Sequence, residues 1–186
     1  METILSVFIG ISLSAAAGFR VFVPFLVMSI AAHTGHLSLT SGFEWVGTTP
    51  ALIAFSSATL FEILAYYIPF IDNLLDAIAT PAAVIAGVVL TASTVTGLNP
   101  FLSWMLAIIA GGGIAATVQS ITGVIRLAST STTGGVANPA VSTAELGGAA
   151  VLSGLAIFFP VIGIVLVGVF ILWGIGKLRR KSAAPQ

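Results

Sequence analysis

The sequence predicts an all-α membrane protein, a polytopic helix bundle with about six spans or with five spans plus re-entrant segments. Of its 186 residues, 58% are hydrophobic and only 6% are charged. Soluble domains carry about 25% charged residues, so this chain has too few charges to cover the surface of a soluble fold of its size. We therefore predict one integral membrane domain over residues 1–176, followed by a basic tail over residues 177–186.

Composition and motifs also exclude several classes of function. The chain has no cysteine, which excludes disulfides and thiolate metal sites, and no basic patch indicates a nucleic acid partner. His33 and His36 have only Glu44 nearby as a third ligand, so we expect no metal site. The sequence contains no Gly-x-Ser-x-Gly or His-Glu-x-x-His motif, and we expect neither an enzyme nor a cofactor.

The first apolar block covers residues 3–32. As one helix it would extend about 45 Å, longer than a hydrocarbon core of about 30 Å, so we expect it to tilt, kink or break within residues 18–24. Gly10, Ser14 and Gly18 are four residues apart, which places them on one helix face. Such a strip of small residues favours close packing against another helix.

Four helix starts share one signature after the polar segment 33–49. In each, a capping Thr or Asn precedes a Pro at the first helical position, where the N–H would be unpaired in any case. These starts are Thr49-Pro50, Thr80-Pro81, Asn99-Pro100 and Asn138-Pro139. They predict spans at roughly 50–68, 81–97, 100–128 and from 139 onward.

The last apolar block covers residues 144–176 around Pro160 and is too long for one span. It can form two short spans, one kinked helix or a re-entrant hairpin. By the positive-inside rule the tail should be cytoplasmic, because it contains Lys177, Arg179, Arg180 and Lys181. Arg126 favours the same side for the loop that follows it. If the last block crosses twice, both termini are expected on the cytoplasmic side of a bacterial inner membrane.

Six spans would divide into halves over residues 1–98 and 99–176, and halves of three spans are inverted relative to each other. The first half shows a weak echo of the second, in which Gly10, Ser14, Gly18 and Arg20 resemble Gly111, Ala115, Gly123 and Arg126. Inverted repeats with broken helices are typical of transporters. The echo raises an inverted repeat as a hypothesis.

Glu62 is the acid that most needs an explanation. It lies about 18 Å along a helix that starts at Pro50, at 1.5 Å per residue, and so inside the hydrocarbon. An ionised carboxylate is costly there and should find a partner or a proton. Arg20 lies at a comparable depth and is the predicted partner. The pair either specifies the fold without a transport role or forms a proton, ion or substrate site.

Asp72 and Asp76 are four residues apart and share one helix face after Pro69. We interpret them as a rim, on a short amphipathic helix at the cytoplasmic surface with both acids in water. The alternative is an acidic vestibule or a hard-cation site that also uses Asn73.

The segment 129–145 is dense in Ser, Thr and Gly. Its two adjacent glycines allow positive φ, and exposed N–H groups there could form an anion nest. Residues 142–145 match a capping box. A polar loop with well-capped helix ends is the plain interpretation. In the functional one, the segment lines a cavity beside Arg126 and its candidate binding residues are Thr133, Gly134, Gly135, Asn138 and Glu145.

Three stretches together resemble a known family: GFRVFVPFL over 18–26, Glu62 with YYIPFIDNLLD over 66–76, and STTGGVANPAVSTAE over 131–145. They are similar to an uncharacterised bacterial membrane-protein family, catalogued as domain of unknown function 4126, over nearly the whole chain. The resemblance implies no settled activity. It implies a shared signature of Gly18, Arg20, Pro24, Glu62, Pro69, Asp72, Asp76, Gly134, Gly135, Asn138, Pro139 and Glu145. In the family an acid often follows the last of these, whereas here Leu146 follows, which weakens a two-carboxylate mechanism.

The function that these features predict is a small transporter or channel. Arg20 and Arg126 favour a small anionic solute, with protons coupled through Glu62. The alternatives are a carrier for lipid-linked phosphates and a non-transporting scaffold or assembly factor. The expected partners are membrane lipids, the solute or a small ion, and further copies of the chain.

Overall fold

In the computed structural model, the chain is built from helices and short connections. The structure describes the backbone of residues 1–182, and their side chains except those of residues 69, 70, 73 and 178–182. No strand occurs within these described residues. The helices are α1 (Glu2–Ala17), α2 (Phe22–His33), η1 (Glu44–Gly47), α3 (Thr49–Ala65), α4 (Pro69–Thr94), α5 (Pro100–Leu106), η2 (Ala107–Gly112), α6 (Gly113–Thr133), α7 (Asn138–Phe158) and α8 (Pro160–Ser182).

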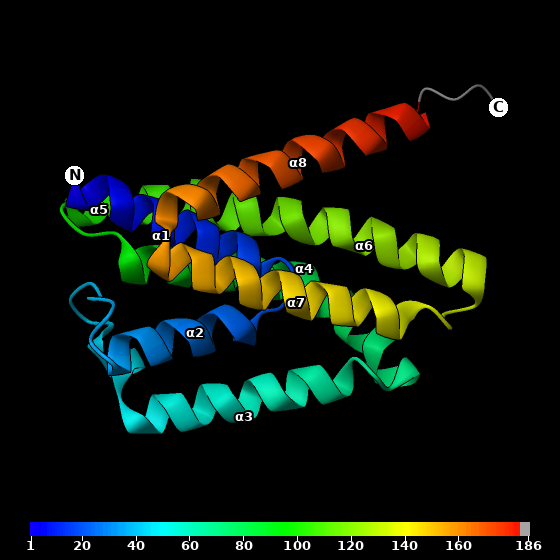
Figure 1. Cartoon of the computed structure of the whole chain (residues 1–186), viewed down its shortest axis with the longest axis horizontal. Coiled ribbons are helices and arrows are strands. Elements are labelled where there is room, and N and C mark those ends of the chain that lie inside the picture. The colour runs from blue at the N-terminus through cyan, green and yellow to red at the C-terminus, as the bar shows by residue number, and fades with distance from the viewer. Residues whose placement is uncertain (183–186) are drawn as a thin grey trace.

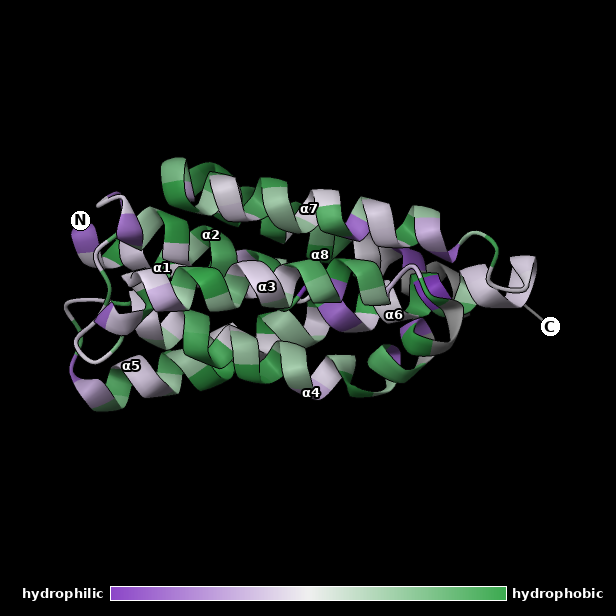
Figure 2. Ribbon diagram, turned by 90° about the horizontal axis from the view of Figure 1, so that it is seen from below, coloured by the Kyte–Doolittle hydropathy of each residue, from purple (hydrophilic) through white to green (hydrophobic). Residues whose placement is uncertain are grey.

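Four helical segments are long and apolar enough to cross a membrane: Leu74–Thr94, Pro100–Thr133, Asn138–Phe158 and Pro160–Lys177. The second of these comprises α5, η2 and α6 in one continuous run. The helices lie side by side along the long axis of an elongated bundle (Figure 1). Most hydrophilic residues lie towards the two ends, and apolar residues dominate between them (Figure 2). The prediction of an all-α membrane bundle is confirmed.

The first apolar block forms a hairpin that turns back inside the bundle. At 1.5 Å per residue α1 is about 24 Å long and α2 about 18 Å, both shorter than a hydrocarbon core of about 30 Å. Both open ends of this hairpin lie beside the C-terminal end of α4. There the Ser6 hydroxyl accepts a hydrogen bond from the Thr96 N–H (3.1 Å), and the Thr40 N–H donates to the Ser93 carbonyl (2.8 Å). We call α1 and α2 the first hairpin and residues 18–21 its tip.

Because of the turn at this tip, each later helix runs in the opposite direction to the one expected if residues 3–32 crossed the bundle. The start of α1 and the end of α8 lie at opposite ends of the bundle (Figure 1). The prediction that both termini lie on one side assumed that residues 3–32 cross the bundle, and the structure does not support it. The start of α1 also lies beside Gly97, just before α5, so α1 and α5 run in the same direction. That is not the relation that an inverted repeat divided at residue 98 requires.

Three of the four predicted helix starts are found. α3 begins at Thr49, α5 follows Asn99, whose side chain accepts from the Leu102 N–H (2.9 Å), and α7 begins at Asn138. The fourth prediction, a start at Pro81, is wrong, because α4 begins at Pro69 and runs through Pro81 to Thr94. A proline inside a helix removes one hydrogen bond, and neighbouring helices make that loss tolerable in membrane helices.

The last apolar block forms two helices, as one of the predicted alternatives allowed. α7 and α8 are separated only by Phe159, whose backbone leaves the helical region (φ −139°, ψ 64°). The Pro160 that follows opens α8, where its missing N–H costs nothing. The break therefore lies at the end of the bundle, and both helices of this block are long enough to cross a membrane.

Small residues bring α1, α4 and η2 into close contact, at what we call the small-residue crossing (Gly10, Ser14, Gly87, Thr91 and Gly111). The Ser14 hydroxyl donates to the Gly87 carbonyl (2.7 Å) and shares a hydrogen bond with the Thr91 hydroxyl (2.8 Å). A Cβ added to Gly87 would lie 2.6 Å from the Gly111 carbonyl, which is shorter than van der Waals contact. The predicted packing role of the small-residue strip is therefore confirmed for Gly10 and Ser14.

Candidate functional site

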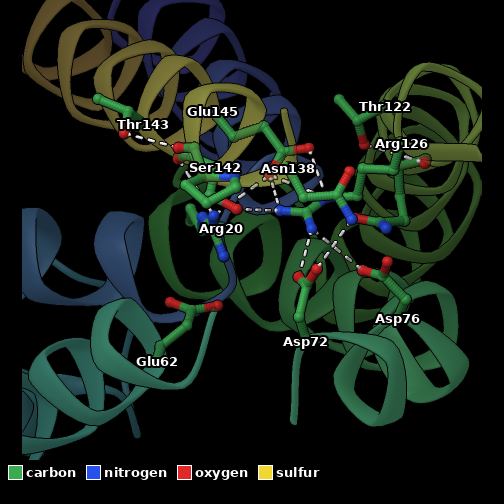
Figure 3. A network of polar contacts seen from close by, with 12 residues as sticks. Arg20, Glu62, Asp72, Asp76, Thr122, Arg126, Asn138, Ser142, Thr143 and Glu145 are labelled. Atoms are coloured by element: carbon green, nitrogen blue, oxygen red, sulfur yellow. Dashed lines mark hydrogen bonds and ion pairs between the residues drawn. The ribbon is translucent and has the colours of Figure 1, made fainter. Parts of the chain in front are cut away.

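Arg126 lies at the centre of a buried polar network between α4, α6 and α7 (Figure 3). Its side chain is almost fully buried. Nε donates to the Glu145 carboxylate (2.9 Å), Nη2 to the Ser142 hydroxyl (2.9 Å) and again to Glu145, and Nη1 to Asp72. A buried guanidinium is stable only when its donors are satisfied in this way. Arg126 thereby fixes three helices relative to one another.

Asp72 lies in the first turn of α4 and is 2% exposed. Besides pairing with Arg126, it accepts a hydrogen bond from the Asn138 side chain (3.2 Å). Asp76 lies one turn further, 3.7 Å from Arg126 Nη1, and its side chain is 31% exposed. The predicted separation of a buried core from an acidic rim in water is therefore wrong for Asp72. The short surface helix predicted after Pro69 is instead the first part of α4, and α4 packs against α6 where Arg126 lies.

Arg20 enters the same network from the tip of the first hairpin. Its Nη2 donates to the Ser142 carbonyl (3.1 Å) and lies 3.3 Å from the Glu145 carboxylate. Its Nε and Nη1 are buried and have no hydrogen-bond partner among the described residues. Glu145 is thus shared by both arginines. The two ends of the predicted site, residues 18–24 and 131–145, do meet here.

The ring of Tyr66 lies against both guanidinium groups. The Arg20 Cζ is 3.6 Å and the Arg126 Cζ 4.5 Å from the ring centroid, within the range of cation–π interactions. Tyr66 follows the end of α3, and burial raises the pKa of its phenol to about 12. The ring therefore presents an uncharged aromatic face to two cations. Sequence reasoning missed this residue, although Tyr66 follows Glu62 by one helical turn and shares its face.

Glu62 does not form the predicted ion pair with Arg20. Its two carboxylate oxygens accept hydrogen bonds from the backbone N–H groups of Val21 (2.8 Å) and Phe22 (3.0 Å). These N–H groups open α2 and have no partner within that helix, and a helix N-terminus attracts negative charge. Glu62 therefore caps a neighbouring helix, at the tip of the first hairpin. The depth of Glu62 in the bundle correctly predicted that its carboxylate has a partner. The partner is the backbone at the start of α2, which the sequence did not indicate.

The remaining predicted residues lie at the edge of the network. Gly134 (φ 63°) and Gly135 (φ 88°) turn the chain between α6 and α7, and the Thr133 hydroxyl accepts from the Ala137 N–H (3.2 Å). The capping box predicted at residues 142–145 is wrong, because Ser142 and Glu145 direct their side chains to the arginines. Ser142 is thus a member of the site that the sequence assigned only to a cap.

We call the eight polar side chains of this network the charge cluster: Arg20, Glu62, Asp72, Asp76, Arg126, Asn138, Ser142 and Glu145. It contains four carboxylates and two guanidinium groups, so it carries two excess negative charges when every group is ionised. Excess buried charge is costly in a low-dielectric interior. Protonation of a carboxylate would lower this cost, whereas an anion that entered without a proton would raise it.

Two cavities reach the cluster from different sides. One of about 270 Å³ is bordered by Tyr66, Asp72 and Asn138 together with the glycine turn. The other, of about 410 Å³, is bordered by Asp76 and Arg126 together with polar residues of α6. Each is large enough for several water molecules, since one occupies about 30 Å³ of liquid. Small solutes and protons can therefore approach the carboxylates of α4 and the guanidinium of α6.

A comparison with protein families matches residues 7–180 to one family, described as "Domain of unknown function (DUF4126)". The match covers nearly the whole chain and confirms the resemblance that the three sequence stretches indicate. No curated protein and no solved structure matches the chain.

Proposed function

The chain belongs to the DUF4126 family, and for this member we propose a transport function. A small anionic solute would bind at the charge cluster, and its movement would be coupled to a proton. The observation that carries the proposal is a broken helical hairpin whose tip places Arg20 in a buried cluster with excess carboxylates. Irregular backbone at membrane depth is tolerated where it is buried in protein or lines a cavity, and broken helices of this kind surround the binding sites of many transporters.

Arg20 is the better candidate for solute binding. Arg126 uses all three of its nitrogen atoms on Asp72, Ser142 and Glu145. Arg20 uses only Nη2, and its buried Nε and Nη1 have no hydrogen-bond partner among the described residues. Each of these two donors can give one charge-assisted hydrogen bond to a carboxylate or a phosphate. An incoming anion would therefore satisfy donors that the described residues leave without a partner.

Glu145 is the better candidate for proton coupling. Its carboxylate is shared between Arg20 and Arg126, so an anion that binds Arg20 competes with it directly. One anion and one proton would then enter together, with no net change in the charge of the cluster. Glu62 is the weaker candidate, because both of its oxygens already cap α2.

The direct test reconstitutes the full-length protein in sealed liposomes that contain a pH-sensitive dye. Chloride, inorganic phosphate and succinate are added outside in turn, and acidification inside is followed in comparison with protein-free liposomes. We expect at least one anion to drive proton entry. In Glu145→Gln that anion should still exchange across the membrane, as radiolabelled counterflow would show, but without proton movement.

Two results would contradict the proposal. One is correctly folded wild-type protein that moves no protons with any anion of the panel, which would favour the scaffold. The other is a Glu145→Gln variant with wild-type proton entry. If Glu145→Gln does not fold, Arg20→Lys replaces it as the test. That variant keeps the positive charge, loses the guanidinium donors Nε and Nη1 and should lose anion exchange.

A carrier for lipid-linked phosphates remains the second candidate, on one observation. An apolar groove of about 390 Å³ between α7 and α8 is bordered by Phe19, the neighbour of Arg20 in the chain. A lipid tail in this groove would place its phosphate near the tip of the first hairpin. Competition between a soluble anion and a lipid-linked phosphate for the same proton signal would separate the two candidates.

For the arrangement in the membrane we propose five crossings, by α3, α4, the run α5 to α6, α7 and α8, with the first hairpin re-entrant. α3 is about as short as α1, at about 25 Å, but it connects the end of the bundle where α2 ends to the end where α4 begins (Figure 1). The basic tail would be cytoplasmic by the positive-inside rule, and the start of α1 would then face the opposite side. We place the protein in a bacterial inner membrane. A homo-oligomer remains part of the proposal, to be tested by the mass of the purified complex.

A further inference from the structure

A second apolar groove lies on the other side of α8, between α8 and α6. It encloses about 190 Å³ and is bordered by Ile121, Val124, Ile125, Ala128, Trp173, Gly174 and Lys177. Its floor is the close contact between the two helices, where a Cβ added to Gly174 would lie 2.5 Å from the Ile121 side chain. The groove is therefore a fixed feature of how α6 and α8 pack.

One end of this groove is cationic. Lys177 borders it and lies over the ring of Trp173, with Nζ 5.0 Å from the ring centroid. Lys177 is the first charged residue of α8, after the apolar run 160–176, and Trp and Lys at such a position anchor a helix at the membrane interface. The groove thus joins apolar walls inside the membrane to an ammonium group at its surface.

The α7–α8 groove provides a comparison within the same molecule. It is larger, at about 390 Å³, and Trp173 borders it as well, but none of its bordering residues among the described side chains is charged. Any lipid can place an acyl chain in either groove, since both are apolar. Among the side chains that the structure describes, Lys177 is the one that offers a positive charge to a headgroup in these grooves, and it borders the α6–α8 groove.

We propose that the α6–α8 groove is a binding site for an anionic phospholipid. One acyl chain lies along α6 against Val124 and Ala128, and the anionic headgroup contacts Lys177. Basic pockets between membrane helices recognise anionic lipids in this way. The proposal does not rest on the transport function, because none of the residues named as bordering the groove belongs to the charge cluster.

The test measures retention of phosphatidylglycerol and phosphatidylcholine with identical acyl chains on the full-length protein in detergent, by native mass spectrometry. The wild type should prefer phosphatidylglycerol. Lys177→Gln should lower affinity for it by about five-fold, the ratio that about 1 kcal/mol per basic residue corresponds to. Inorganic phosphate should not compete, because the acyl chain contributes to binding.

A matched pair of variants locates the site. Ala128→Trp fills the α6–α8 groove and should abolish the preference for phosphatidylglycerol. Val169→Trp fills the α7–α8 groove and should leave that preference unchanged. Equal effects of the two substitutions would overturn the proposal. So would wild-type affinity in Lys177→Gln, or displacement of the lipid by inorganic phosphate alone.

Discussion

The first hairpin is held at two places by opposite means. At the small-residue crossing, α1 approaches α4 and η2 so closely that no side chain larger than those present fits between them. At its tip, the hairpin is held by Arg20, which contacts α7, and by Glu62 of α3, whose carboxylate accepts hydrogen bonds from the backbone at the start of α2. We therefore interpret the crossing as a pivot that is held by steric fit. The tip is held by ion pairs and hydrogen bonds, which a proton or an anion would change under the proposed transport function.

Substitutions in the two regions should therefore differ in their effects. At the crossing they should lower the free energy of unfolding, and the flux should fall only as far as the amount of folded protein falls. In the charge cluster they should also change the flux per folded molecule.

The largest expected effect is that of Arg126→Ala. It leaves Asp72 with only the Asn138 amide and Glu145 with only Arg20 as a partner, and breaking a buried ion pair from one side costs about 3–5 kcal/mol. We expect a loss of that size in the free energy of unfolding, measured in mixed micelles with increasing denaturing detergent. A loss below about 1 kcal/mol would show that the cluster is hydrated and does not hold the helices together.

Gly111→Val should have the next largest effect. The new side chain would overlap Thr91 and the Gly87 carbonyl, and overpacking of this kind costs about 1–3 kcal/mol. The same micelle titration measures the loss. Proton flux per folded molecule should stay at the wild-type level. If flux per folded molecule falls steeply, the crossing takes part in transport and is not only a pivot.

Ser14→Ala should have the smallest effect, with Ser12→Ala as its matched control. Ser14 bonds to α4, whereas the buried Ser12 hydroxyl has no partner among the described residues. Hydrogen bonds between membrane helices contribute about 0.6 kcal/mol on average. Ser14→Ala should lose about that much, and Ser12→Ala should lose nothing. Equal losses in the two variants would contradict the hydrogen-bonding role given to Ser14.

The sequence predicted the helices better than their directions. Proline after a capping residue located three helix starts, because that signature reflects local backbone chemistry. The same signature failed at Pro81, where the preceding turns from Pro69 were helical already. The break in residues 18–24 was also predictable. Whether the chain then continues or turns back depends on contacts with Ser142, Glu145 and Glu62, which no local pattern encodes.

The candidate site was predicted in its members more than in its pairings. Composition marks Arg20, Glu62, Arg126 and Glu145, because charged residues are rare in this chain and costly in a membrane. Pairing depends on the register of one helix against another, which is why Asp72 was assigned to a rim. The backbone partner of Glu62 was unpredictable for a further reason, since the free N–H groups of any helix N-terminus could have donated to its carboxylate.

The first hairpin turns back within the bundle and ends at the charge cluster, and the side of the membrane on which each end of the chain lies tests this directly. The chain has no cysteine, so Glu2→Cys and Ser182→Cys can each carry the single thiol of the molecule. Both variants are labelled with a membrane-impermeant maleimide, added first to intact cells and then to inverted vesicles. A re-entrant hairpin predicts that the two positions are labelled from opposite sides. Labelling of both from the same side would mean that residues 3–32 cross the membrane, and it would contradict a re-entrant first hairpin.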